Sequence, residues 1–322
     1  MSKATLTIAH LEALLATRDP ALLVDRVHPR FGTHAQANHR WSTTDPPLAQ
    51  YPEALEEILD LDDGWFEWGA DADQQERRII AAVAQDEALL DILAKGYDAH
   101  TLDTCDVFDL PKPPDMKDPH TSPLAAEWRA FIGWQGKKDK RRVMGKNYFF
   151  SLCYGKLPRN MMEIPGARAL GLSPKRFEAA AARTLQRYPG IRKWQQSVRQ
   201  RVLVRPVSRT LLGTRRSSHL RGNELYRAML DHPIQGTAAD MMNLIIVQIH
   251  QELSPKVSLR WTKHDFMSWN IREELVTGPT LCRMAEIAEQ DWDAGGLKFR
   301  VPITCYVRRK GQEKQIWARQ PK

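Results

Sequence analysis

Residues 141–155 read Arg141-Arg142-Val143-Met144-Gly145-Lys146-Asn147-Tyr148-Phe149-Phe150-Ser151-Leu152-Cys153-Tyr154-Gly155, and this stretch decides how the chain is interpreted. Arg142, Lys146, Phe150 and Tyr154 recur at every fourth position, so on an α-helix they share one face. Two cations followed by two aromatic rings can hold a triphosphate at one end of this face and stack a base at the other. A basic amphipathic helix whose rings enter the core gives the same pattern, so other segments must distinguish the two readings.

The charge of the chain favours a polyanionic partner without identifying it. The 322 residues carry a formal net charge of +8. Acidic residues dominate residues 53–98, whereas residues 137–146 and 201–227 are strongly basic. A metal site beside a phosphate-binding track would separate the charges in this way, and so would two solvated faces of opposite sign.

The cysteines and the hydropathy exclude other classes of protein. The four cysteines lie far apart and form no Cys-x-x-Cys pair, which argues against a zinc ribbon or a disulfide framework and fits a reducing cytoplasm. The N-terminus has no apolar signal core, and the longest aliphatic run, residues 244–247, is too short to span a bilayer. We expect a soluble intracellular protein with no membrane association.

Two aspartates are predicted to follow or join short strands. Residues 64–70 predict an aromatic-rich strand that presents Asp71 at its end, and residues 259–262 and 266–271 predict a hairpin whose tip carries His264 and Asp265. A carboxylate at a strand end is a common ligand for Mg²⁺, although a lone aspartate there is more often a turn former. Two further elements are expected, namely a long helix that opens at residue 232 and an alternating strand at residues 297–307.

Several segments resemble, in order, the motifs of the DNA polymerase I family, also called family A. Asp71-Ala72-Asp73-Gln74-Gln75-Glu76-Arg77-Arg78 is similar to motif A, the stripe from Arg142 to Gly155 to motif B, and Lys263-His264-Asp265 to the motif C hairpin. Residues 39–46, residues 227–240 and residues 315–318 are similar to further segments of the family. The resemblance extends from about residue 30 to the C-terminus.

The resemblance implies an α+β fold with a palm, formed by an antiparallel sheet with helices, and helical fingers. Residues 1–80 would form the first part of the palm and residues 223–322 the second. Residues 81–222 would form the fingers, including a proline-rich insertion at 109–136. Only about forty residues precede Arg40, so the thumb is expected to be absent or vestigial, with no exonuclease domain.

The resemblance also implies roles for individual residues. Asp71 and Asp265 would hold two Mg²⁺ ions, which Mn²⁺ can replace, and Lys146 would serve catalysis by giving a proton to the leaving pyrophosphate. The nucleotide would contact Arg142, Lys146, Phe150, Tyr154, His100, Gln74 and Glu76, and Glu76 would occupy the space of a ribose 2′-hydroxyl. The DNA contacts would be Arg40, Arg227, Gln235, His264 and Asp231.

The sequence also departs from the family pattern. Phe266 replaces the acidic residue that usually follows the motif C aspartate, so reduced activity or an altered metal preference is expected. Asp231 replaces an asparagine, and a carboxylate close to template DNA would weaken binding. In the motif A segment, Asp73 is either a further metal-site carboxylate or a solvated side chain.

The function expected from this resemblance is template-directed DNA synthesis on primer-template DNA from deoxynucleoside triphosphates. Low processivity is expected, with a role in repair, lesion bypass or phage replication that depends on a partner protein. The location would be the cytoplasm of a bacterial or phage-infected cell. Two alternatives stay open, namely a single-subunit RNA polymerase or primase-like enzyme and a catalytically weak DNA-binding accessory protein.

Overall fold

The computed structural model describes residues 61–317, together with strands β1 (Arg30–Gly32) and β2 (Ser42–Thr44), which pair antiparallel. Arg40 lies outside the described residues. The chain divides into two compact units. Among the described residues, the sheet unit holds residues 61–73, 239–290 and 302–317, and the helical unit holds residues 74–238 and 291–301.

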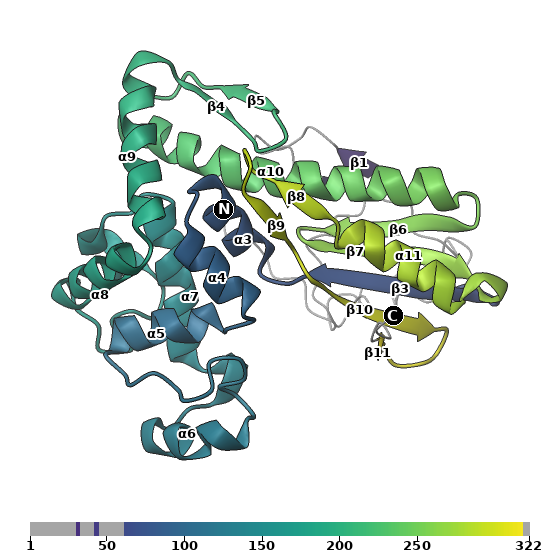
Figure 1. Ribbon diagram of the computed structural model, residues 1–322, viewed down its shortest axis with the longest axis horizontal. Helices are drawn as coiled ribbons and strands as arrows, with labels where there is room; N and C mark the ends of the chain where they lie inside the picture. Colours follow the sequence, from purple (N-terminus) through teal and green to yellow (C-terminus); the bar gives the residue numbers. More distant parts are fainter. Residues whose placement is uncertain (1–29, 33–41, 45–60, 318–322) are drawn as a thin grey trace, which may run out of the picture. The chain divides into compact units, whose positions relative to one another are not determined.

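The sheet unit is built on a five-stranded antiparallel sheet in the order β11-β10-β3-β7-β6 (Figure 1). Its strands are β3 (Trp65–Ala72), β6 (Val257–Lys263), β7 (Phe266–Arg272), β10 (Ile303–Arg309) and β11 (Gln315–Trp317). Side chains of β3 alternate between the two faces, so Trp68 and Ala70 are fully buried on one face while Asp71 is exposed on the other. The predicted strand at 64–70 and the predicted hairpin are thereby confirmed.

Among the described residues, two helices complete the sheet unit. They are α11 (Gly278–Ala288) and the part of α10 (Gly222–Leu253) that begins at residue 239, with the 3₁₀ turn η6 (Glu273–Leu275) before α11. Arg283 of α11 donates to both carboxylate oxygens of Glu252 at the end of α10, at 2.8 and 2.7 Å. Because this pair is half exposed, it fixes the geometry of the two helices more than it adds to stability.

A buried carboxylate ties the three central strands together. Glu67 of β3 is 2% exposed and accepts hydrogen bonds from Ser268 Oγ of β7 at 2.5 Å and from Tyr306 Oη of β10 at 3.0 Å. Arg308 of β10 adds an ion pair at 2.7 Å. Burial opposes ionisation of Glu67, but the Ser268 hydrogen bond and the Arg308 charge outweigh it, so the pKa of Glu67 is lowered. The strand that presents Asp71 is thus anchored on both sides.

Gly69 provides the space for the Tyr306 ring that reaches Glu67. A Cβ atom at position 69 would lie 2.6 Å from the Tyr306 hydroxyl oxygen and still closer to its ring carbons. We expect Gly69→Ala to destabilise the protein by about 1–3 kcal/mol, because the ring must leave its position. Urea unfolding measures this, with Gly278→Ala as the control, since open space surrounds that glycine. A Gly69→Ala variant with the wild-type midpoint would contradict the prediction.

The helical unit contains most of the helices. They are α3 (Gln75–Val83), α4 (Glu87–Ala94), α5 (Ala99–Phe108), α6 (Ala126–Ile132), α7 (Lys140–Cys153), α8 (Pro174–Arg187), α9 (Pro189–Val204) and residues 222–238 of α10, with 3₁₀ turns η3 (Pro123–Ala125), η4 (Gly136–Lys138) and η5 (Pro158–Glu163). The unit also contains two β-hairpins. One is formed by β4 (Val207–Arg209) and β5 (Arg215–Ser217), and the other by β8 (Asp291–Asp293) and β9 (Lys298–Arg300). Among the described residues, no helix is long and apolar enough to cross a membrane.

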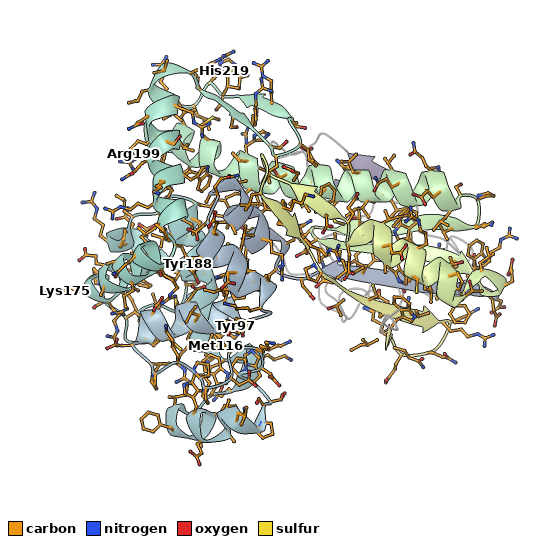
Figure 2. The ribbon with its side chains drawn as sticks, in the orientation of Figure 1. Tyr97, Met116, Lys175, Tyr188, Arg199 and His219 are labelled. Atoms are coloured by element: carbon orange, nitrogen blue, oxygen red, sulfur yellow. The ribbon has the colours of Figure 1, made fainter. Side chains whose placement is uncertain are left out.

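The helices α5 and α7 approach each other very closely. A Cβ atom on Gly145 of α7 would lie 2.8 Å from the backbone nitrogen of Thr104 in α5, so only glycine fits at this position. Tyr148, Phe149 and Tyr188 fill the core beside this contact, and Figure 2 labels Tyr188 inside the unit. Tyr148 and Phe149 of α7 therefore enter the core, whereas Phe150 and Tyr154 of the predicted stripe are only partly buried.

Two elements differ from their predicted extents. The long helix begins at Gly222, and Pro233 lies inside it instead of in its first turn. Pro233 lacks an N–H, so one intrahelical bond is missing there, while Thr237 Oγ1 donates to the Pro233 carbonyl at 2.5 Å. The alternating run at residues 297–307 is not one strand. It is interrupted at Pro302 between β9 and β10, and the Pro302 carbonyl accepts a bond from Asp73 N at 2.8 Å.

Candidate active site

The structure brings Asp71 and Asp265 together at neighbouring strand ends. Asp71 lies opposite Phe266 of β7, and the backbone N–H of the next residue, Ala72, donates to the Asp265 carbonyl at 3.1 Å. Asp265 occupies the two-residue turn between β6 and β7, where His264 has a φ of 55°. The antiparallel register is what unites these carboxylates from positions 194 residues apart in sequence (265 − 71 = 194).

This pair of carboxylates fits a divalent ion that has further ligands from substrate and water. Mg²⁺ is usually held by one or two carboxylates plus phosphate oxygens, which matches two aspartates. Asp73 lies nearby, but it accepts a hydrogen bond from Thr304 Oγ1 at 3.0 Å. Within residues 61–317, no group of three or more His, Cys, Asp or Glu side chains could hold a metal without such external ligands.

Phe266 follows Asp265 directly and lies opposite Asp71 in the register of β3 and β7. Its ring centroid lies 5.0 Å from that of Trp261 and 6.0 Å from that of Tyr306, with which it is nearly parallel at 10°. The residue that replaces an expected carboxylate thus joins a row of three rings. At position 266 the chain therefore carries an aromatic ring where the family pattern has a third carboxylate.

The two cations of the α7 stripe differ in their surroundings. Lys146 is exposed, and no hydrogen bond or ion pair with the described residues holds its ammonium group. Arg142 is instead held by Asp98, the N-cap residue of α5, with Nε donating at 2.9 Å and Nη2 at 3.1 Å. Its remaining nitrogen, Nη1, makes one long contact of 3.5 Å to the Lys137 carbonyl. Lys146 is therefore the available cation, and Arg142 can offer only Nη1 without breaking its ion pair.

His100 lies in a buried network below the α7 stripe. It is 6% exposed, its Nδ1 lies 3.0 Å from Arg77 Nη2, and its ring packs 5.9 Å from that of Phe150. Burial and the charge of Arg77 lower the pKa of His100 well below its usual value. In this arrangement His100 is a neutral core residue that packs against Phe150. The phosphate contact expected for His100 stays a prediction.

Arg77 and Asp103 form a buried ion pair that sequence reasoning missed. Both side chains are fully buried, and the Arg77 guanidinium also stacks on the Phe149 ring with its carbon 3.6 Å from the ring centroid. Burial raises the pKa of Asp103 to about 6, although the Arg77 charge opposes this shift. The sequence held one indication of this pair. Arg77 lies just before the apolar run of α3, and a charge at such a position requires a partner when the helix is buried.

Glu76, Tyr154 and Gln235 come from three sequence motifs and meet in one hydrogen-bonded group. The Tyr154 hydroxyl donates to Glu76 Oε1 at 2.5 Å and accepts a bond from Gln235 Nε2. Burial and the Glu76 charge raise the pKa of Tyr154, so the hydroxyl keeps its proton. The Glu76 carboxylate is thereby fixed in direction. Asp231 adds negative charge to the surroundings of Tyr154.

The remaining predicted residues occupy separate positions. Gln74 precedes α3 with a φ of 52°, and its Oε1 atom is buried with no hydrogen-bond partner in the described structure. Arg227 on α10 and His264 in the turn are exposed. The structure thus connects Glu76, Tyr154 and Gln235 in one unit and Asp71 and Asp265 in the other.

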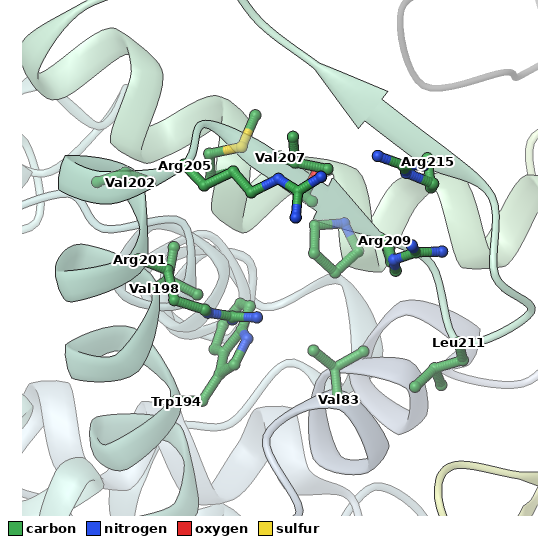
Figure 3. Close-up of a pocket in the computed structure, with 13 residues that line it drawn as sticks. Val83, Trp194, Val198, Arg201, Val202, Arg205, Val207, Arg209, Leu211 and Arg215 are labelled. Atoms are coloured by element: carbon green, nitrogen blue, oxygen red, sulfur yellow. The ribbon is translucent and has the colours of Figure 1, made fainter.

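A pocket of about 340 Å³ in the helical unit is surrounded by arginines (Figure 3). Its lining includes apolar side chains of α9, the β4–β5 hairpin and α10, together with four exposed arginines at positions 201, 205, 209 and 215. Within the described part of the chain, no carboxylate pairs with these four guanidinium groups. The predicted basic segment 201–227 therefore forms a cationic surface suited to phosphate groups.

The chain is similar to known proteins over most of its length. The family model for DNA polymerase family A matches residues 2–310. The thermostable DNA polymerase I of Thermus filiformis is 28% identical over 243 residues, which cover 71% of this chain and 26% of the relative. DNA polymerase I of Pseudomonas aeruginosa is 26% identical over 267 residues, which cover 78% of this chain and 26% of the relative. The chain thus spans about a quarter of the length of these relatives.

Among solved structures, the fold matches the POL domain of Pol1 from M. smegmatis in complex with DNA primer-template and dNTP. The TM-score is 0.71 at 22% sequence identity, and the match covers 94% of this chain and 50% of that chain. This similarity confirms the expected α+β fold with an antiparallel sheet and helices. Because the family model matches nearly the whole sequence, the chain belongs to DNA polymerase family A.

Proposed function

We propose that this chain is a template-directed DNA polymerase that adds deoxynucleotides to a primer 3′ end by two-metal phosphoryl transfer. The observation that carries the proposal is the juxtaposition of Asp71 and Asp265 at neighbouring strand ends in a family A chain. When bound, two Mg²⁺ ions, which Mn²⁺ can replace, would stabilise the charge on the attacking and leaving oxygens. Asp71 and Asp265 would hold these ions.

The other residues of the site would orient the substrates. Lys146 is exposed on α7, so its ammonium group can bind the triphosphate and give a proton to the leaving pyrophosphate. Phe150 would pack on the sugar and base of the nucleotide. Glu76, held by Tyr154, would fill the space that a ribose 2′-hydroxyl needs. Discrimination against ribonucleotides would follow from the fixed direction of this carboxylate.

The sheet unit would act as the palm and the helical unit as the fingers. DNA would contact Arg40, Arg227, Gln235, His264 and Asp231, and the arginine-lined pocket would add phosphate contacts. The low processivity expected from the sequence is tested by extending a long primed template at physiological salt in the presence of a trap for free enzyme. Products of many nucleotides from one binding event would contradict it.

Removing arginines from the pocket should weaken DNA binding in a salt-dependent way. Each guanidinium that contacts a phosphate releases counterions, so Arg205→Ala combined with Arg209→Ala should reduce DNA affinity about tenfold and lower the salt slope by about 1–2. Fluorescence anisotropy at several salt concentrations measures both quantities. Lys175→Ala removes one exposed positive charge on α8 (Figure 2) and is the control, with the effects compared per charge removed. Equal effects from the control would show that only net charge matters.

Primer extension tests the proposed activity itself. The purified chain is given a primed DNA template and Mg²⁺, with deoxynucleotides and ribonucleotides in parallel reactions. Incorporation of deoxynucleotides in the template order supports the proposal. Ribonucleotide incorporation at a comparable rate would instead indicate an RNA polymerase or primase-like enzyme. DNA binding without any incorporation would indicate an accessory protein, an outcome that the loss of the carboxylate at Phe266 favours over RNA synthesis.

A further inference from the structure

The proline-rich insertion is a folded lobe attached to α5 and α7. Trp128 and Trp134 bury their rings against Cys105 of α5, with Leu110 and Ile132 packed around them. The Trp128 indole N–H donates to the Pro111 carbonyl at 2.7 Å and so fixes the start of the insertion. These contacts hold the lobe in one arrangement relative to α5. A surface loop without a core would not be held in this way.

His120 connects this lobe to the N-terminus of α5. Its Nε2 lies 2.7 Å from Asp98 Oδ2, and its Nδ1 receives a hydrogen bond from Trp134 Nε1 at 3.1 Å. The rings of His120 and Trp134 are nearly parallel, with an interplanar angle of 8° and centroids 6.1 Å apart, as a hydrogen bond in the plane of both rings requires. An indole nitrogen can only donate, so Nδ1 must be the acceptor and the ring hydrogen is on Nε2. Trp134 thus selects the tautomer in which His120 donates to Asp98.

Asp98 in turn holds Arg142. Its side chain is 10% exposed and accepts from Arg142 Nε and Nη2, from Thr101 Oγ1 and from the backbone N–H groups of His100 and Thr101. Its own N–H donates to the carbonyl of Met116 in the insertion at 2.8 Å, and Figure 2 labels Met116 beside Tyr97. Burial opposes ionisation, but the hydrogen bonds from His120 and Arg142 keep the pKa of Asp98 well below its usual range.

We propose that His120 and Trp134 are positioning residues that act through Asp98 to fix the Arg142 guanidinium for binding of the nucleotide triphosphate. The proposal rests on the proposed polymerase function. Asp98 occupies Nε and Nη2 and thereby sets the plane of the guanidinium, and Nη1 remains on the α7 stripe that also carries Lys146. Without the His120 bond, Asp98 loses one of the donors that define its orientation. Arg142 then samples more rotamers, and nucleotide affinity falls while the chemical step is unchanged.

The test is a comparison of His120→Leu with His120→Gln. Leucine removes the donor, whereas the glutamine amide keeps an N–H that can reach Asp98. We expect His120→Leu to raise the KM for deoxynucleotides about five- to tenfold with kcat within about twofold, the effect of one hydrogen bond on binding. His120→Gln should recover most of the affinity. Trp134→Phe keeps an aromatic ring in the lobe and loses the donor to Nδ1, so it should give an intermediate KM.

Two controls separate positioning from a general loss of structure. Trp128→Phe alters the same lobe and loses the bond to Pro111, yet it should leave KM unchanged. In an Arg142→Ala background, His120→Leu should raise KM no further, because both changes act on one interaction. An equal KM increase in Trp128→Phe, or additive effects in the double variant, would overturn the proposal.

Direct titration with a fluorescent deoxynucleotide triphosphate analogue measures the ratio of the nucleotide affinities of wild type and His120→Leu without turnover. A wild-type chain that binds this probe but does not extend a primer would refute the proposed function and still report on His120. A His120→Leu variant that binds the probe as tightly as wild type would refute the positioning role alone.

Discussion

Asp71→Asn should reduce deoxynucleotide incorporation by on the order of 10³-fold, and Asp265→Asn should do the same. Both substitutions remove one negative charge from a pair whose proposed role is to hold cations. Asp71 is exposed and Asp265 lies in a turn, so neither change disturbs the core, and the wild-type unfolding temperature should be retained. Single-turnover incorporation at saturating Mg²⁺ and nucleotide measures the effect.

Asp73→Asn is the matched control for this prediction. Asp73 lies two positions from Asp71 and carries the same charge, but its carboxylate accepts a bond from Thr304. We expect a loss of less than about tenfold, since an asparagine oxygen can still accept that bond. A loss at Asp73 as large as that at Asp71 would show that the metal site contains a third carboxylate. Full activity in Asp71→Asn would refute the two-metal proposal.

Glu76→Ala should lower discrimination against ribonucleotides by about 10²-fold, because the alanine leaves room for a 2′-hydroxyl beside the sugar. The structure sharpens this prediction, since the Tyr154 hydroxyl, itself held by Gln235, fixes the Glu76 carboxylate. The measurement is the ratio of kcat/KM for a deoxynucleotide and its ribonucleotide opposite the same template base.

Tyr154→Phe provides the graded test of the same idea. It keeps the ring and removes only the hydroxyl that holds Glu76, so discrimination should fall by less than in Glu76→Ala. If Tyr154→Phe lowered discrimination further than Glu76→Ala, the tyrosine ring itself and not the carboxylate would be the selecting group. Unchanged discrimination in Glu76→Ala would rule out the steric role proposed for Glu76.

Local patterns in the sequence predicted the features that local interactions determine. The short aromatic-rich run at residues 64–70 and the two runs on either side of His264 and Asp265 predicted the strands. Strand ends present side chains in a way that sequence alone can indicate. The helix with the Arg142 to Tyr154 stripe was also predicted, because a four-residue spacing repeats with the helical turn. These elements carry most of the candidate site.

The interactions that sequence could not predict join residues far apart in the chain. Arg142 was expected to be available for phosphate, but Asp98 holds it through a contact across 44 residues. The burial of Arg77 was not predicted, because its charge is compensated by Asp103, which lies 26 positions away in the sequence. The extents of α10 and β10 depend on how the chain accommodates Pro233 and Pro302, and this is decided by tertiary contacts as well as by propensity.

The close approach of α5 and α7 at Gly145 also restricts how this protein can change over evolutionary time. Any larger side chain at position 145 collides with the backbone of Thr104, and no substitution at position 104 removes a backbone atom. A second mutation at position 104 therefore cannot compensate for a larger residue at position 145, as it could where two side chains are in contact. We therefore expect substitutions in α5 and α7 to be tolerated on their other faces, while the distance between the two backbones at Gly145 stays the same.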